Sequence, residues 1–354
     1  MGNARSLISL LLKLAFVVAL FGFMILQKQE KPRILVIQSG GGDTLWTRSL
    51  EEGITRILVP RTAMVIRHHA MNLNESPDPT LPQTATSIAL QMVKDWSPDI
   101  VMLFDDPAQK LVGTRLLNHP HIRIVYGGVN GRPEDYGYDK APNVTGVLER
   151  KPLAALRDAL VFIARARGFN LDDKAAARPR LLWLTDSSDS ASADFSDVDH
   201  FDWEPLEWLP PRRVDNFPAW QITVEAAHQE ADLLLVTDYS QLRTEPGSDR
   251  YVTPPALIMR WTEDHARIPV VGGSTGIAAD GGMLGIAASG IAQGERAARK
   301  ALALIRGEKK PDDMPPEIPR NLAVGMRKAQ AIRRHLAFPA LYEAFARQTE
   351  GFYE

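Results

Sequence analysis

The side chains of this sequence that could do chemistry stand directly after short apolar runs, which predict buried strands. In an open parallel sheet, ligands bind beyond the carboxyl ends of the strands, so these positions should line one site. The candidate ligand-binding residues are Ser39, Gly41, Trp46, Asp105, Asp106, Gly128, Asn130, Asp186, Ser187, Asp238, Tyr239 and Ser274.

The chemistry of these groups suits a small polar or zwitterionic molecule. Carboxylates such as Asp105 and Asp238 accept hydrogen bonds from an ammonium group, whereas backbone amides and hydroxyls donate to a carboxylate. Trp46 and Tyr239 add aromatic surface that would cover an apolar part of the ligand. The pattern therefore favours a binding site over a single reactive centre.

Two of these pieces have alternative interpretations that the sequence leaves open. The run SGGGDT, residues 39–44, follows a predicted strand and opens a helix, which is also a place for phosphate. It has neither G-x-G-x-x-G spacing nor the lysine of a P-loop, so a tight turn facing a ligand fits better. Asp105 and Asp106 have three interpretations: an acid–base pair, ligand contacts, or a cap of the next helix. Pro107 at the first helical position supports the cap for Asp106.

The sequence gives little support for catalysis or for a metal. His68 and His69 are adjacent rather than spaced like zinc ligands, so solvated histidines at a strand end are the better interpretation. Ser274 stands in the run GGSTG, residues 272–276, after a predicted strand, but it has no evident histidine partner, so hydrolase chemistry has weak support. The sequence has no cysteine, which excludes a disulfide and a thiolate metal site. We therefore expect no catalytic residue, no metal and no cofactor.

Strand-like and helix-like segments alternate along most of the chain. The expected strands are 33–38, 63–67, 99–104, 122–126, 144–147, 180–185, 232–237 and 268–272. The expected helices are 44–58, 84–96, 108–117, 152–167, 216–230, 254–266 and 293–306, whereas 191–213 is acidic and expected to be irregular. Strands separated by such helices form βαβ units of parallel sheet with right-handed crossovers. We therefore predict two α/β lobes, each built on a doubly wound parallel sheet.

The N-terminus predicts an attachment to a membrane. The run from Leu7 to Leu26 is apolar except for Ser9 and Lys13 and is long enough to span a bilayer. No small-residue cleavage site follows it, so an uncleaved anchor is expected, with a cleaved signal peptide as the alternative. The net charge of −2 over 354 residues gives no electrostatic case for binding nucleic acid.

Several of these segments together resemble a known family. The pieces PDIVMLFDD, IRIVYGGVNGRPEDYGY and NVTGVLER, and later DNFPAWQITVEAAHQEADLLLV and the stretch from Gly281 to Arg333, resemble the ABC transporter substrate-binding protein family. That family has the type I periplasmic binding protein fold, and its relatives include binders of aromatic amino acids. The resemblance extends from Arg33 to about Ala346.

The resemblance implies a division of the chain and a mechanism. Residues 1–30 would form the anchor or signal, 31–146 with 283–315 the first lobe, and 147–282 with 316–354 the second. Hinge segments are expected at NVTGV (143–147), near 272–285 and at 309–322. Two lobes joined in this way close on a ligand like a jaw.

The expected function is therefore non-enzymatic binding of a small, amino acid-like solute, which the protein delivers to an ABC permease. The protein would lie on the periplasmic side of the inner membrane, held by its N-terminal helix. Three alternatives remain open at this point: a tethered ligand sensor for a membrane signalling protein, an enzyme that uses the inter-lobe cleft, and a structural membrane protein with a vestigial pocket.

Overall fold

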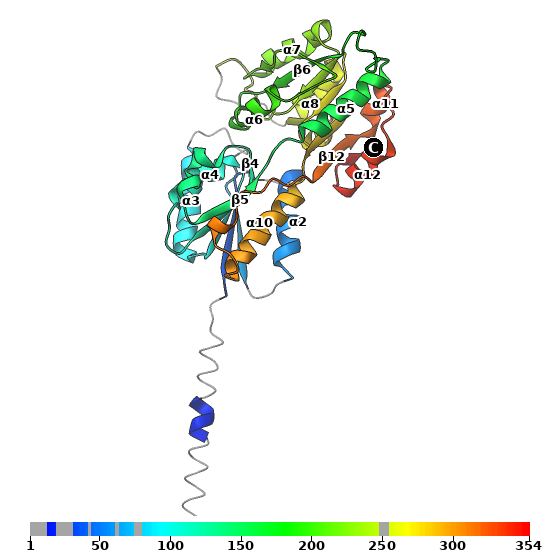
Figure 1. Ribbon diagram of the computed structural model, residues 1–354. Helices are drawn as coiled ribbons and strands as arrows, with labels where there is room; N and C mark the ends of the chain where they lie inside the picture. Colours follow the sequence, from blue (N-terminus) through cyan, green and yellow to red (C-terminus); the bar gives the residue numbers. More distant parts are fainter. Residues whose placement is uncertain (1–12, 19–30, 42–43, 61–63, 74–79, 248–254) are drawn as a thin grey trace, which may run out of the picture.

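The chain forms two β-sheets that lie in separate lobes, with helices packed around each (Figure 1). The computed structural model describes residues 13–18, 31–41, 44–60, 64–73, 80–247 and 255–354. The predicted α/β architecture with parallel sheets is confirmed.

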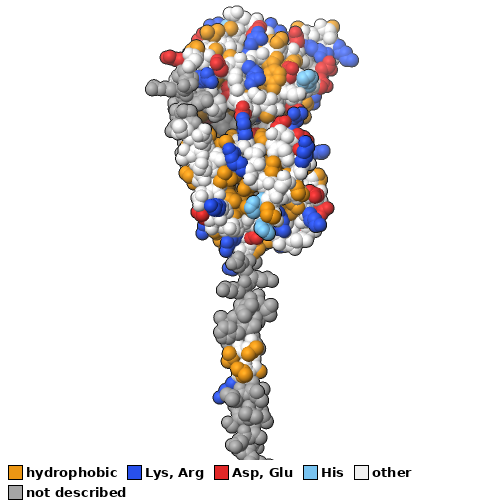
Figure 2. Space-filling model, turned by 90° about the vertical axis from the view of Figure 1, so that its left-hand side faces the viewer, with side chains coloured by type: hydrophobic (Ala, Val, Ile, Leu, Met, Phe, Trp, Pro, Cys, Tyr) orange, Lys and Arg blue, Asp and Glu red, His pale blue; other side chains and the backbone are white. Residues whose placement is uncertain are grey.

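The surface is of mixed charge. On the face in Figure 2, acidic and basic side chains are interspersed over both lobes rather than gathered into one basic patch. On this face the distribution agrees with the net charge of −2.

The first sheet consists of five parallel strands. Their spatial order is β2 (Val65–Ala70), β1 (Arg33–Gln38), β3 (Ile100–Phe104), β4 (Arg123–Val129) and β5 (Val144–Leu148). All residues of β3 and β5 are buried, as expected for strands that are covered on both faces. In register, Gln38 of β1 pairs with Phe104 of β3, so the residues that follow these strands emerge at one edge.

Helices cover both faces of the first sheet. One layer contains α3 (Leu81–Trp96), α4 (Asp106–Leu111) and the short turns η1 (Gly113–Arg115), η2 (Pro133–Tyr136) and η3 (Tyr138–Lys140). The other contains α2 (Leu45–Leu58), which begins at Thr44 with a side-chain cap, and α10 (Gly290–Ile305). A Cβ at Gly294 would lie 2.2 Å from the Leu50 carbonyl oxygen, so α10 can approach α2 this closely only with glycine.

The second sheet is mixed. Its order is β13 (Phe352–Tyr353), β12 (Leu322–Arg327), β11 (Leu284–Ala288), β10 (Val270–Gly272), β9 (Leu233–Val236), β6 (Arg180–Thr185) and β7 (Glu207–Trp208), with β8 (Arg212–Arg213) also on β6. The pair β11–β12 is antiparallel, whereas the other pairs are parallel. This one antiparallel pair departs from the fully parallel lobe that we predicted.

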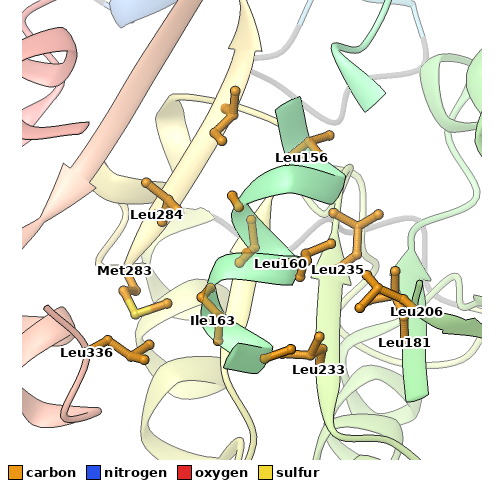
Figure 3. Packing of buried hydrophobic residues seen from close by; sticks show 14 of the residues in the cluster. Leu156, Leu160, Ile163, Leu181, Leu206, Leu233, Leu235, Met283, Leu284 and Leu336 are labelled. Carbon is orange, nitrogen blue, oxygen red and sulfur yellow. The ribbon is translucent and has the colours of Figure 1, made fainter. Parts of the chain in front are cut away.

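The second lobe has its own hydrophobic cores. Its helices are α5 (Leu153–Ala166), α6 (Asp189–Asp199), α7 (Phe217–Glu230), α8 (Pro255–His265), α9 (Gly276–Ala279), α11 (Lys328–Arg333) and α12 (Ala340–Gln348). Figure 3 shows Leu156, Leu160 and Ile163 of α5 packed against leucines of the sheet. The helix α6 lies where the sequence led us to expect an irregular segment.

The chain passes between the lobes at three places. Residues 149–152 join β5 to α5, Ser289 joins β11 to α10, and residues 314–321 join η4 (Pro311–Asp313) to β12. The last crossing lies within the predicted segment 309–322. The second lies later than the predicted 272–285, because β11 pairs with β10 and β12 and so belongs to the second sheet, whereas the predicted division put residues 283–288 in the first lobe.

The predicted anchor, residues 7–26, lies mostly outside the described residues, of which only 13–18 fall within it, and these are helical. Within the described part of the chain, no helix combines the length and the apolar character needed to cross a bilayer.

Candidate functional site

Asp105, at the end of β3, occupies an unusual backbone conformation. Its φ of 66° and ψ of 157° lie in a region that residues other than glycine rarely adopt. Such strain costs about 1–3 kcal/mol and gathers at functional sites. The side chain does not cap α4, although capping was one prediction for this residue.

The Asp105 carboxylate lies beside the indole of Trp46. Trp46 Nε1 donates to Asp105 Oδ1 at 2.9 Å. Burial of the carboxyl raises its pKa to about 7; the hydrogen bond from Trp46 opposes this shift, and the negative charge of Asp106 adds to it. At neutral pH the carboxyl is therefore close to half-protonated, and a nearby positive charge would ionise it fully.

Gly128 allows these groups to come together. Its φ is +61°, and a Cβ there would lie 2.9 Å from Trp46 Cζ2 and 3.2 Å from Asp105 Oδ1. Its backbone amide donates to Gln293 Oε1 of α10 at 3.1 Å, while Gln293 Nε2 donates to the Leu148 carbonyl. The predicted residues Trp46, Asp105 and Gly128 thus form one patch.

Asp106 has a structural role that differs from that of Asp105. Its carboxylate accepts from the backbone amides of Asn130 (3.0 Å) and Gly131 (2.8 Å) and from the Tyr136 hydroxyl (2.6 Å). These bonds fix the loop after β4, so Asp106 is neither the helix cap nor part of an acid–base pair with Asp105.

The first predicted residues after β1 also serve the framework. The buried Ser39 hydroxyl donates to the Phe104 carbonyl at 2.9 Å and accepts from the Ala108 amide at 2.8 Å. It therefore joins the end of β1 to the start of α4. Gly41 is buried at the end of the same segment, and residues 42–43 of the run SGGGDT, which we interpreted as a tight turn facing a ligand, lie outside the described residues.

In the second lobe, several predicted residues are held by their neighbours. Asp186 is fully buried and accepts from the backbone amides of Ser188 and Gln241, both at 3.0 Å. Tyr239 is 6% exposed and donates to Asp280 Oδ2 at 2.6 Å, so it belongs to the core rather than to an aromatic cover. Ser274 accepts from the Gly276 amide at 3.2 Å, and Ser187 is exposed.

Asp238 instead joins a buried ion-pair group at the first crossing. Lys151 Nζ lies 2.9 Å from Asp194 Oδ2 and 3.5 Å from Asp238 Oδ2, and the side chains of Lys151 and Asp194 are only 9% and 2% exposed. Burial disfavours the ammonium, but the charges of Asp194, Asp238 and Glu149 outweigh it, so the pKa of Lys151 lies above its ordinary value. The lysine therefore stays charged.

Glu149, two residues earlier on the crossing, is half-buried, and burial together with neighbouring charges determines its pKa. Burial raises its pKa to about 8; the charge of Lys151 opposes the shift, and those of Asp194, Asp105 and Asp106 add to it. Residues of both lobes thus act on this side chain. We call Asp105, Glu149, Lys151, Asp194 and Asp238 the inter-lobe cluster.

Hydrogen bonds and an ion pair connect the lobes next to this cluster. Asn130 Nδ2, after β4, donates to Ser190 Oγ of α6 at 3.5 Å, and Ser190 Oγ donates to Asp238 Oδ1 at 3.1 Å. Lys110 of α4 lies 3.5 Å from Asp189 of α6. The Asn130 side-chain oxygen is buried and has no partner among the described residues.

A pocket of about 450 Å³ opens on the second-lobe side of the cluster. Arg150 and Lys151 of the crossing line it together with the second half of α6, and His200 and Phe201 complete its wall. Of the inter-lobe cluster, Lys151 and Asp194 line this pocket, whereas Asp105, Glu149 and Asp238 do not.

The structure thus divides the predicted residues into two groups. Trp46, Asp105, Gly128, Asn130 and Asp238 lie at or beside the inter-lobe cluster. Most of the remaining polar ones hold loops in place through hydrogen bonds within their own lobe, namely Ser39, Asp106, Asp186, Tyr239 and Ser274, whereas Ser187 is exposed. Sequence reasoning missed Glu149, Lys151, Asp194 and Ser190; the only available signal was the charged run LERK directly after NVTGV.

Among the described residues, no three histidine, aspartate or glutamate side chains are arranged to hold a metal ion. His68 and His69 lie on β2, where His68 Nδ1 is 3.9 Å from Glu51 Oε1.

Comparison with known proteins identifies the fold. No protein-family model and no curated protein matches the chain. A conserved domain protein from Vibrio cholerae matches with a TM-score of 0.63 at 14% identity, over 89% of this chain and 98% of that one. A domain of an ABC protein from Streptococcus pneumoniae in complex with L-Trp matches with 0.62 at 16% identity, over 91% and 100%.

A ligand-free, open substrate-binding protein with adhesive properties from Clostridium difficile matches with a TM-score of 0.63 at 15% identity, over 87% of this chain and 96% of that one. At these identities the likeness shows the fold. The resemblance seen in the sequence is therefore confirmed at this level: the structural neighbours of the chain are ABC transporter solute-binding proteins of the type I periplasmic binding protein fold.

Proposed function

We propose that this protein is an extracytoplasmic solute-binding protein that closes two lobes over a small, amino acid-like ligand and delivers it to an ABC permease. In this proposal its N-terminal segment is an uncleaved anchor that holds it on the periplasmic side of the inner membrane. The protein binds its ligand and does not transform it.

The observation that carries the proposal is the meeting of both lobes and a crossing at one polar cluster. Asn130 of the first lobe and Asp238 of the second contact the same hydroxyl, Ser190 Oγ. Glu149 and Lys151 lie on the segment that joins the lobes. A molecule held at this place would contact both lobes at once, and closure around it would be favoured by those contacts.

The fold and the pocket add support. Relatives in structure include a protein with bound L-Trp, which is an amino acid with an apolar side chain. The volume of about 450 Å³ beside the cluster is in the range of small-molecule sites.

Thermal unfolding of the full chain with amino acids, amines, sugars and nucleotides tests the proposal. A ligand that binds only the folded state stabilises it by about 2.7 kcal/mol at a hundredfold excess over its dissociation constant. We expect a rise in the midpoint with a small nitrogen-containing solute and recovery of that solute unchanged. Chemical conversion of the bound compound would favour an enzyme instead, and the lack of any rise would argue against solute binding.

A further inference from the structure

The positive charges near the inter-lobe cluster already have partners. Lys151 lies between Asp194 and Asp238. Arg150 donates to the carbonyl oxygens of Val129 (3.2 Å) and Asn130 (2.9 Å), and its Nε lies 3.6 Å from Asp197. Both cations therefore already contact acceptors of the protein, and Lys151 in particular lies between two carboxylates, which disfavours an anionic group of a ligand beside it.

The acceptors of the same place are not all used. The Asp105 carboxylate accepts from Trp46, and the pKa of the half-buried Glu149 carboxyl is set by burial and neighbouring charges, with no hydrogen bond among its causes. An independent observation points the same way: the buried Asn130 Oδ1 has no hydrogen-bond partner within the described part of the chain. A buried acceptor of this kind normally has a donor, so a ligand that brings N–H groups would complete it.

The aromatic ring beside Asp105 holds the carboxylate in place. Trp46 Cζ2 lies close to the backbone of Gly128, and the indole N–H donates to Asp105 Oδ1 at the edge of the ring. The protein therefore fixes one carboxylate oxygen, and Oδ2 is the oxygen that can accept a hydrogen bond from a ligand.

We propose that the ligand is an organic cation, a primary amine or an amidine, whose positive group is bound by Asp105, Glu149 and the side-chain oxygen of Asn130. This inference rests on the proposed solute-binding function and narrows its ligand class. A free carboxylate on the ligand would meet the negative charges of the cluster, so an amine should bind better than the amino acid from which it differs by one carboxylate.

Proton binding should compete with this ligand. Asp105 and Glu149 hold protons more tightly than ordinary carboxyls do, with pKa values of about 7 and 8. The charged groups that act on them are Asp106, Lys151 and Asp194. A cation needs the ionised forms, so its affinity should fall as the pH is lowered from 8.5 to 6, and binding below pH 8 should release protons.

The test compares matched ligands on the full chain by calorimetric titration at pH 8: tryptamine with tryptophan, tyramine with tyrosine, agmatine with arginine, and benzoate as an anion. We expect at least one amine to bind about tenfold tighter than its amino acid, because a hydrogen bond to a charged group is worth roughly 1.5–3 kcal/mol. Its affinity should fall at pH 6.

Three variants assign the effect to residues. Asp105→Asn and Glu149→Gln keep size and shape, and each should weaken amine binding by about 10- to 100-fold, the equivalent of a hydrogen bond to a charged group. Asp189→Asn is the matched control, because this carboxylate is 84% exposed and its loss changes the net charge equally. It should change the affinity less than threefold, as expected of an exposed charge.

The outcomes separate this inference from the proposed function. Tighter binding of an amino acid or of benzoate than of the amines would overturn the cation assignment and leave solute binding intact. Equal loss in Asp189→Asn and Asp105→Asn would overturn the assignment of the residues. No binding by any compound would overturn the proposed function and this inference together.

Discussion

Lys151→Met should destabilise the protein severely, because it leaves two carboxylates without their counter-ion. Asp194 and Asp238 lie 2.9 Å and 3.5 Å from the ammonium, and Asp194 is only 2% exposed. Removing one partner of a buried ion pair costs about 3–5 kcal/mol. Since domains are stable by roughly 5–15 kcal/mol, this is a large fraction of the total.

The loss should depend on pH in a defined direction. Burial raises the pKa of Asp194, and Lys151 opposes that shift, so without the lysine the pKa must rise further. The folded variant then binds a proton more tightly than the unfolded chain, in which the pKa is about 3.9. Stability therefore falls as the pH rises above that value, and the defect is largest at pH 8 and smaller at pH 5.

The assay is urea unfolding of wild type and variant at pH 5 and pH 8. Lys110→Met is the matched control, since Lys110 also faces an aspartate, Asp189 at 3.5 Å, but these side chains are 70% and 84% exposed. That exposed pair should contribute no more than about 1 kcal/mol. Equal losses in the two variants, or a Lys151→Met defect that grows toward acid pH, would refute the reasoning.

Two further changes test the neighbourhood of the cluster. Glu149→Gln should stabilise the protein by at least about 1 kcal/mol at pH 8.5 and by much less at pH 5, since each unit of raised pKa corresponds to about 1.4 kcal/mol. The unfolded chain ionises this carboxyl above its ordinary pKa of about 4.3, whereas the folded protein holds the proton up to about pH 8, so the cost of the glutamate grows between these two pH values. An unchanged midpoint at pH 8.5 would contradict this. Gly128→Ala should cost about 1–3 kcal/mol and weaken ligand binding, because the new methyl group meets Trp46 at 2.9 Å. In comparison, Gly168→Ala has positive φ but open space around it and should cost only about 1 kcal/mol, which thermal unfolding of both variants will show.

The sequence predicts best the elements whose apolar runs are compatible with a single type of secondary structure. The run IVMLF becomes the fully buried strand β3, because only a strand covered on both faces uses five consecutive apolar residues. The helix α6 was missed because DSASADFSDVD is rich in serine and aspartate, which favour turns. It forms where Ser188 caps its first turn and where Asp194 meets Lys151.

The strand β11 was misplaced for a related reason. Its sequence LGIAA has few of the β-branched residues that mark strands. The structure needs small residues there, because a Cβ on Gly285 would lie 2.0 Å from the Ser274 carbonyl oxygen. This close packing is a requirement of the tertiary structure, which local strand propensity does not reflect. The prediction therefore placed the second crossing before this strand instead of after it.

The gathering of polar residues at the strand ends was predictable, but the hydrogen-bond partner of each residue was not. Polar residues that follow the parallel strands do lie near the place where the two lobes meet. Whether each of them is free to bind a ligand depends on the hydrogen-bonding groups that the fold puts beside it. Ser39 and Asp106 use their oxygens on nearby backbone amides, whereas Asp105 has one donor, the indole of Trp46. Spacing along the chain contains no information on those partners.

The first crossing connects the site to the motion that the proposed function requires. It carries three charges in sequence, and each meets different surroundings. Arg150 donates to carbonyls of the first lobe, Lys151 pairs with carboxylates of the second, and Glu149 is acted on by burial and by charges of both lobes. Both cations already contact acceptors of the protein, and Lys151 lies between two carboxylates, so this place favours a positive ligand group over a negative one. A cationic ligand neutralises Glu149 at the point about which the lobes would move, whereas an anion would add repulsion there. Glu149 would then both select the ligand and favour the closed state. Burying its carboxylate costs desolvation free energy, and only the charge of a bound cation compensates that cost.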